Sequence, residues 1–176
     1  MTISNNAGNF RNEAEIKKDR LRYTKNKLSA NLALLGIVFD ALYFVNIYKS
    51  DVGSYYYNII IGLSVVYNLV FMLAAFLSSE GVKSYKRAYS FVLMALGIGQ
   101  IVRIFILPMN AKNATIVLSN IEEPVMGDEQ FMWVCIFLIL SAFFCIISGI
   151  IALIKTNTLE SYQAELAKKA AEDNEQ

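Results

Sequence analysis

Four long stretches of the chain consist almost entirely of apolar residues, and shorter polar segments separate them. The stretches are residues 28–48, 57–78, 88–107 and 131–154. A helix of about 20 apolar residues matches the hydrocarbon core of a bilayer, which is roughly 30 Å thick. The pattern therefore predicts an all-α integral membrane protein, in which four spanning helices form one bundle over residues 28–154.

Polar segments flank this predicted bundle on both sides. We expect a polar and basic N-terminal segment at 1–27, in which 1–10 is Asn-rich and disordered and 11–27 is a weakly amphipathic helix. The tail at 155–176 is predicted to be a separate amphipathic helix, because Asn157 and Glu160 suit its N-cap and third position. The 108–130 segment is the largest loop, and its residues 115–118 have β-propensity.

Basic residues are unevenly divided between the two sides that four spans define. Thirteen lysines and arginines fall in 1–27, in the loop after the second stretch and in the tail, whereas Lys49 and Lys112 fall in the other loops. Basic residues near span ends stay cytoplasmic, so we expect both termini on the cytoplasmic side of the cell membrane. The first stretch is too long for the apolar region of a signal peptide, and it should remain as a span.

Aromatic residues cluster at the expected ends of the spans. They are Tyr55, Tyr56, Tyr57 and Trp133 at the outer ends, and Tyr85 and Tyr89 at the inner ends. Such residues are enriched at membrane–water boundaries, because their rings are apolar and their tips are polar. We favour this interpretation over an aromatic cage for a cation or sugar at 55–57.

Composition excludes several kinds of chemistry. The chain has no histidine, the commonest metal ligand and the usual general base near neutral pH. Its two cysteines have no zinc spacing, and no phosphate-binding glycine motif is present. The outer-loop carboxylates lack the regular spacing of a calcium loop. An intramembrane aspartyl enzyme needs two acids, and only Asp40 lies within a span. We expect no enzyme, no cofactor and no metal site.

Asp40 and Arg103 are the two charged residues within the apolar stretches. At 1.5 Å per residue they lie about 18 Å and about 22 Å above the inner boundary. Gln100 and Asn68 fall in the same layer. A charged residue inside a membrane is costly and marks a functional site by default. These four residues form the predicted intramembrane polar cluster.

Small residues share helix faces with this cluster. Ala33 and Gly36 are on the face of Asp40, and Ala95 and Gly99 are on the face of Arg103. Membrane helices approach one another through small residues. The predicted helix-packing residues are Gly36, Gly99, Ser141, Cys145 and Ser148.

Three interpretations of the two charges remain open at this point. We favour an Asp40–Arg103 pair that fixes helix register, as buried polar groups sometimes do. The same pair would also suit a site for a ligand or a proton. In the third interpretation the pair does not form, and Arg103 extends outward past Pro108 to water.

The chain resembles uncharacterised small four-span membrane proteins of low-GC Gram-positive bacteria. The resemblance lies in the Asn- and Lys-rich leader, the run Lys17-Lys-Asp-Arg-Leu-Arg-Tyr-Thr-Lys25 and the run Arg103-Ile-Phe-Ile-Leu-Pro108. It implies a four-span fold in a bacterial membrane and no particular activity.

Two functions fit these features. We favour an accessory or regulatory subunit of a larger membrane transport complex, whose partners are the lipid bilayer and another membrane protein and do not include nucleic acid. The alternative is a homo-oligomeric small transporter or channel that uses Asp40 and Arg103 as a polar pathway site. Small multidrug transporters are similar in having four spans and one acidic residue. They differ in lacking an equivalent of Arg103, the long tails and the large outer loop.

Overall fold

The computed structural model describes residues 4–49, 59–118 and 121–174. Along these residues the elements are α1 (Ser4–Tyr23), α2 (Lys27–Ile47), α4 (Ile59–Lys83), α5 (Arg87–Ile106), α6 (Pro108–Asn113), β1 (Thr115–Leu118), β2 (Ile121–Pro124) and α7 (Asp128–Asn174). The helices α2, α4, α5 and α7 are long and apolar enough to cross a membrane. The prediction of four spanning-length helices is confirmed, and these helices suggest a multi-pass membrane protein.

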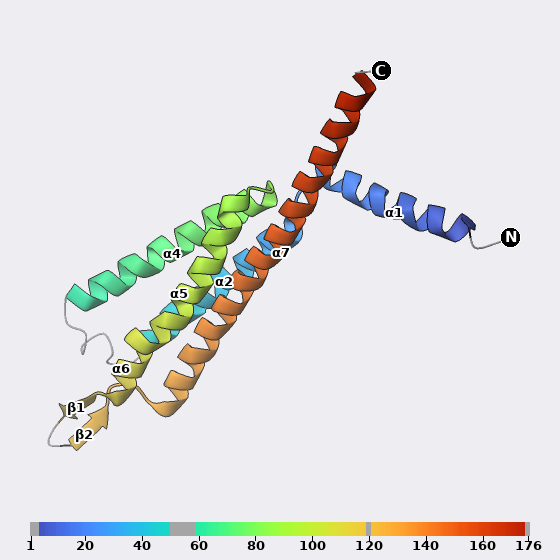
Figure 1. The fold of residues 1–176 in the computed structure, drawn as a ribbon. Helices are drawn as coiled ribbons and strands as arrows, with labels where there is room; N and C mark the ends of the chain where they lie inside the picture. Colours follow the sequence, from blue (N-terminus) through green and yellow to red (C-terminus); the bar gives the residue numbers. More distant parts are fainter. Residues whose placement is uncertain (1–3, 50–58, 119–120, 175–176) are drawn as a thin grey trace.

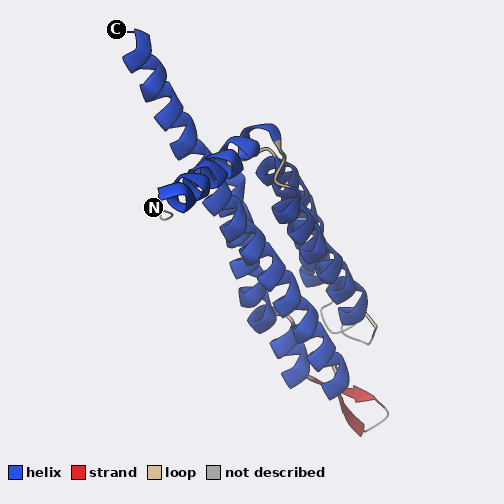
Figure 2. Cartoon of the chain, turned by 90° about the vertical axis from the view of Figure 1, so that its right-hand side faces the viewer, coloured by secondary structure: helices blue, strands red, loops and turns tan. Residues whose placement is uncertain are grey.

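The four long helices run side by side as a bundle. Helix α7 packs along both α2 and α5, and α4 packs against α2 and less closely against α5. The β1–β2 hairpin lies at one end of the bundle, and both ends of the chain lie at the other (Figures 1 and 2). Helix α1 leaves the bundle at a wide angle beside α7 (Figure 1).

Small and polar residues make up much of the interior of the bundle, beside some large apolar ones, while many other large apolar side chains point outward. Ala33, Ala75 and Ala152 are fully buried, whereas Leu63 is 68% exposed and Phe105 is 61% exposed. This distribution is typical of membrane helices, because small residues permit close helix contact and lipid solvates the large apolar side chains.

Helices α2 and α7 approach most closely at Gly36. A Cβ atom on Gly36 would lie only 2.8 Å from Cys145 Sγ. The Ser141 hydroxyl donates a hydrogen bond to the Gly36 carbonyl at 2.8 Å, and the Ser148 hydroxyl donates to the Ser29 carbonyl at 2.6 Å. At this contact, serine side chains of α7 therefore bond directly to backbone carbonyls of α2.

Helices α5 and α7 meet through glycines other than the one expected. A Cβ on Gly97 would lie 2.9 Å from the Ala142 carbonyl oxygen, and one on Gly149 would lie 2.7 Å from the Ser90 carbonyl oxygen. Gly99 instead faces α4, with its nearest contact at the Tyr67 hydroxyl, and Ala95 is exposed. Residues two apart on a helix point about 200° apart, so Gly97 and Gly99 face different neighbours.

The turn between α4 and α5 is closed by backbone hydrogen bonds. The Lys86 amide donates to the Gly81 carbonyl at 3.1 Å, and the Tyr85 amide donates to the Val82 carbonyl at 3.1 Å. This is the Schellman pattern of a helix C-terminus, which requires a left-handed residue after the last turn. Tyr85 fills that position with a φ of 56°, although glycine is the usual residue there.

Asn26 joins three helices at the end of the bundle where the chain termini lie. Its side-chain oxygen caps α2 by accepting from the Ser29 amide at 3.5 Å, and it also accepts from Lys155 Nζ at 3.0 Å. Its own backbone amide donates to the Lys83 carbonyl at 3.0 Å. Asn26 is 1% exposed and has almost no contact with water. These bonds supply the hydrogen-bond partners that its buried polar groups require.

At the opposite end, the segment predicted as a loop is folded. Pro108 begins α6, where its missing amide hydrogen costs nothing. Residues 115–118, expected to be β-prone, form β1, which pairs antiparallel with β2 from Thr115 opposite Pro124 to Leu118 opposite Ile121. Val125 and Met126 are buried after the hairpin, and Lys112 pairs with Asp128.

Two predictions about the polar flanks are wrong. Helix α7 continues without a break from Asp128 to Asn174, so Asn157 is a mid-helix residue and not the cap of a separate tail helix. No proline or glycine interrupts residues 150–176, and nothing else there stops a helix. Helix α1 begins at Ser4, so the part of 1–10 that is described is helical rather than disordered. Tyr55, Tyr56 and Tyr57 lie outside the described residues.

Candidate functional site

The four polar residues predicted to share one layer are brought together in the centre of the bundle. Asp40 comes from α2, Asn68 from α4, and Gln100 and Arg103 from α5. Asp40 Oδ1 accepts hydrogen bonds from Gln100 Nε2 at 2.7 Å and from Arg103 Nη1 at 3.3 Å. Arg103 Nη1 also donates to Asn68 Oδ1 at 2.6 Å. One guanidinium nitrogen thus links three of the four long helices.

The cluster has almost no exposed surface. Asp40, Asn68 and Gln100 have no exposed surface, and Arg103 is 4% exposed. The Arg103 guanidinium carbon lies 4.3 Å from the centre of the Tyr43 ring and 4.9 Å from that of Tyr67. A cation above an aromatic face is attracted by the ring quadrupole. Arg103 therefore points into the bundle, and it does not extend outward to water.

The predicted cluster does not include the two tyrosines, although Tyr43 is a candidate partner of Asp40 from the sequence. Tyr43 is three residues after Asp40 on α2, and Tyr67 directly precedes Asn68 on α4. The spacing of three between Asp40 and Tyr43 places both on one helix face, which is a usable signal for a shared environment. Tyr67 has no such signal, because adjacent residues on a helix point about 100° apart.

The cluster also contains polar atoms without partners. Asp40 Oδ2, Asn68 Nδ2 and Gln100 Oε1 make no hydrogen bond with any described residue. The single ion pair at 3.3 Å leaves Asp40 and Arg103 joined through one oxygen and one nitrogen rather than two of each. A buried pair of this kind neutralises two charges. Its single contact is weaker than a bidentate pair, in which two nitrogens donate to two oxygens.

A groove opens beside Arg103, between α4 and α5. It has a volume of about 400 Å³ and is lined by Leu63, Ser64, Tyr67, Gly99, Val102, Arg103, Ile106 and Leu107. The two helices diverge toward the hairpin end of the bundle (Figure 1). Gly99 has no side chain, and this leaves room for the groove between the helices. Most of the lining is apolar, so lipid or an apolar molecule suits it better than water.

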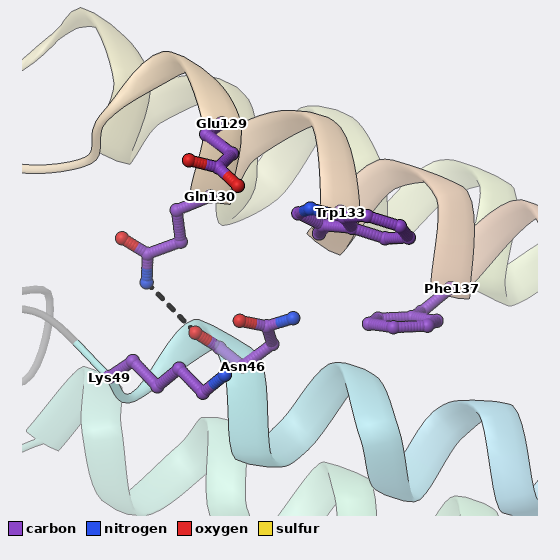
Figure 3. A pocket seen from close by; sticks show the side chains of 6 residues that line it. All are labelled: Asn46, Lys49, Glu129, Gln130, Trp133 and Phe137. Atoms are coloured by element: carbon purple, nitrogen blue, oxygen red, sulfur yellow. Dashed lines mark hydrogen bonds between the residues drawn. The ribbon is translucent and has the colours of Figure 1, made fainter.

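A second cavity lies at the hairpin end, between α2 and α7 (Figure 3). Its volume is about 480 Å³, and its lining residues are Asn46, Lys49, Glu129, Gln130, Trp133 and Phe137. Gln130 Nε2 donates to the Asn46 carbonyl at 2.8 Å and to the Ile47 carbonyl at 3.4 Å, which joins α7 to the last turn of α2. The sequence indicates Trp133 only as a boundary residue. Predicting a cavity between two helices would require knowing which helices are neighbours, and the sequence does not give that.

The predicted packing residues divide between two places. Gly36, Ser141, Cys145 and Ser148 lie at the contact of α2 with α7, and Gly99 lies in the groove beside Arg103. Over the residues that the structure describes, no group of three or more His, Cys, Asp or Glu side chains is placed to hold a metal ion.

Comparison with protein-family models, with curated proteins and with solved structures gave no match.

Proposed function

We propose that this protein is an accessory or regulatory subunit of a larger membrane transport complex, and that its Asp40–Arg103 pair fixes helix register in the bundle instead of carrying a substrate. The burial of the polar cluster supports this most directly. Arg103 is 4% exposed and lies between two tyrosine rings. Charged residues on an ion or proton pathway usually contact a water-filled cavity. Arg103 borders the groove between α4 and α5, but neither of the two cavities includes Asp40 in its lining.

We further propose that both termini face the cytoplasm. Both lie at the same end of the bundle (Figure 1), together with the basic loop between α4 and α5. The hairpin end carries far fewer lysines and arginines. Because basic residues near span ends are retained inside, this distribution favours a cytoplasmic position for α1 and the end of α7.

The cytoplasmic end offers a surface for a partner. Beyond Glu160, which pairs with Arg87 of α5, the rest of α7 forms an extension that leaves the bundle (Figure 1), and most of its residues are exposed. On α1, Ile16 is 64% exposed and Tyr23 is 79% exposed. A lone polar helix gains little stability from its own hydrogen bonds, and tertiary packing normally supplies the remainder. A partner subunit that packs against α1 and the α7 extension would supply that contact.

Co-purification with a truncation control tests the accessory role. The full chain, tagged at its N-terminus, is isolated from gently solubilised native membranes beside a variant that ends at Thr158. We expect a transport protein at fixed stoichiometry with the full chain and its loss with the truncated chain. Recovery of the chain alone, or only as its own oligomer, would contradict the accessory role.

Thiol labelling tests the orientation. Cys135 and Cys145 are replaced by alanine, and single cysteines are introduced at Met109, which is 44% exposed, and at Ala171 on the α7 extension. A membrane-impermeant reagent applied to intact cells should label Met109→Cys and leave Ala171→Cys unlabelled. The opposite labelling pattern would place the termini outside.

The groove beside Arg103 favours one alternative, a homo-oligomeric transporter or channel. In that case a second copy would cover the groove, and Arg103 would line a pathway between protomers. Flux through proteoliposomes that contain only this protein tests the alternative. Unchanged flux in an Asp40→Asn variant would exclude a coupling role for the carboxylate.

A further inference from the structure

The cavity between α2 and α7 carries two opposite charges that do not pair. Lys49 extends from the end of α2, and Glu129 extends from the first turn of α7 (Figure 3). The ion pairs among the described residues are Arg22–Asp19, Lys83–Glu80, Arg87–Glu160, Arg103–Asp40 and Lys112–Asp128, so neither Lys49 nor Glu129 takes part in one. One cavity thus presents a separate cation and anion to a bound molecule.

Aromatic rings form another wall of this cavity. The Trp133 and Phe137 rings are one helical turn apart and stack with their centres 5.8 Å apart, at an angle of 28°. Both rings face the space between α2 and α7, and the Asn46 side-chain amide lies opposite them (Figure 3). An exposed tryptophan face attracts a cationic group. The cation-binding features, Trp133 and Glu129, therefore lie on α7, and the anion-binding Lys49 follows the end of α2.

The location of the cavity indicates the source of a ligand. It lies at the ends of two helices that are long enough to span a membrane. Tryptophan is enriched at the level of lipid headgroups, and Trp133 lies at such a helix end. The volume of about 480 Å³ is in the range of sites that hold small ligands.

We propose that this cavity binds the phosphoethanolamine group of a zwitterionic phospholipid. The Lys49 ammonium donates hydrogen bonds to the phosphate oxygens. The lipid ammonium donates to the Glu129 carboxylate and the Asn46 side-chain oxygen, and it lies against the Trp133 ring. A headgroup with a phosphate but no ammonium leaves Glu129 unpaired, and a choline headgroup has no N–H to donate.

The cavity is held open before the lipid binds. Gln130 joins α7 to the last turn of α2 through two backbone carbonyls, at 2.8 and 3.4 Å. Asn46 also lies in that last turn, where the partial negative charge of the helix end favours a bound cation. Binding therefore requires little rearrangement, which favours affinity. This site is independent of the accessory role, because it involves neither α1 nor the α7 extension.

Trp133 supplies a direct readout, because it is the only tryptophan in the chain. The purified full chain in detergent is titrated with dihexanoyl lipids that carry ethanolamine, choline or glycerol headgroups, and Trp133 fluorescence is followed. We expect a saturable change with phosphatidylethanolamine at a concentration about tenfold lower than with phosphatidylglycerol, since about 1.4 kcal/mol of added interaction gives that ratio. Equal titrations for the two lipids would overturn the proposal.

Variants separate this site from general lipid contact. Glu129→Gln removes the carboxylate that accepts from the lipid ammonium, and it should reduce the preference for phosphatidylethanolamine over phosphatidylglycerol to less than threefold. Lys49→Gln removes the donor to the phosphate that both lipids carry, so it should raise the midpoint concentration for both lipids and leave the preference between them. Lys86→Gln, an exposed lysine at the other end of the bundle, is the matched control and should keep the full preference. Wild-type selectivity in Glu129→Gln, or wild-type midpoints for both lipids in Lys49→Gln, would overturn the assignment.

Glycerophosphoethanolamine, which lacks the acyl chains, distinguishes the two sources of this headgroup. No change in Trp133 fluorescence up to millimolar concentration would support a lipid ligand. A saturable change that both cavity variants lose would support the same recognition of phosphoethanolamine, but from a water-soluble molecule. A change that persists in both variants would overturn the proposal.

Discussion

Arg103 contacts residues of α2 and α4 through Nη1 and the face of its guanidinium, while its Nε and Nη2 atoms are buried without a hydrogen-bond partner among the described residues. Asp40 and Asn68 accept its hydrogen bonds, and the rings of Tyr43 and Tyr67 lie within 5 Å of its guanidinium carbon. Burying a charge costs free energy, and removing one partner of a buried ion pair costs more, because the other charge is then unpaired. Replacing both partners by apolar residues of similar size often leaves the free energy of unfolding unchanged. We therefore expect that removing either Asp40 or Arg103 alone destabilises the protein strongly, and that replacing both together destabilises it much less.

The first prediction follows from this dependence. Asp40→Ala should lower the free energy of unfolding by about 3–5 kcal/mol, because it leaves the Arg103 charge buried and unpaired. The double variant Asp40→Leu/Arg103→Met should recover most of that loss. Unfolding in mixed micelles, followed by circular dichroism, measures both. A double variant as unstable as Asp40→Ala would mean that the polar network itself is required.

Sequence reasoning predicted which polar residues meet, and it did so from two simple measures. Residue counting placed Asp40, Asn68, Gln100 and Arg103 at one depth, and helix periodicity placed Asp40 on a small-residue face. Neither measure indicates which atoms bond. That Gln100 and Arg103 share one oxygen of Asp40 depends on side-chain rotamers and on the exact distance between helices.

At the scale of helices, two glycines offer a matched test of close packing. Gly36 is in contact with Cys145 and Ser141, whereas a Cβ atom on Gly62 would have nothing within 4 Å. Gly36→Ala should destabilise the bundle by about 1–3 kcal/mol through overpacking. Gly62→Ala should be neutral or stabilise by up to about 1 kcal/mol, because alanine favours the helix. Equal effects of the two changes on the unfolding free energy would contradict the close α2–α7 contact.

The turn between α4 and α5 gives a third prediction, at Tyr85. Its φ of 56° is unfavourable for a side chain with a Cβ atom and is free of strain for glycine. Tyr85→Gly should therefore be more stable than Tyr85→Ala by about 1 kcal/mol, although both remove the ring. Thermal unfolding of the two variants measures the difference. If the alanine variant were at least as stable, the left-handed conformation at this position would be wrong.

The ends of the helices were predicted less well than their centres. Apolar runs placed the starts of the four long helices within about three residues, but α7 continues far past the end of its run, and the Asn157 and Glu160 spacing suggested a helix start that is not there. Asn and Glu at that spacing are also tolerated inside a helix, and the sequence alone does not distinguish the two cases. The Gly97 and Gly99 contacts show a similar ambiguity, because periodicity identifies a helix face but not the neighbour that it meets.

At the scale of the whole molecule, α7 is the longest continuous element. Its 47 residues correspond to about 70 Å, more than twice the thickness of a hydrocarbon core. The bundle contacts its first half, and Lys155 is bonded to Asn26 where the second half begins. The arrangement of neighbours around α7 was not predictable from the sequence, since all four long helices have comparable apolar faces.

The fourth prediction tests whether the second half of α7 is one rigid helix. Spin labels at Asn157→Cys and Ala171→Cys, in a background without Cys135 and Cys145, should be about 21 Å apart along the axis. A narrow distance distribution from pulsed electron paramagnetic resonance in lipid would support the continuous helix. A broad distribution would contradict it and would favour a frayed tail.

Because α7 is continuous, its orientation within the bilayer and the position of its far end change together. A transmembrane helix adjusts its tilt to the thickness of the surrounding bilayer. The part of α7 after Glu160 is about 21 Å long, so a tilt change of about 10° moves its end by about 4 Å. The thickness of the bilayer around the bundle therefore affects the position of the exposed C-terminal end of α7.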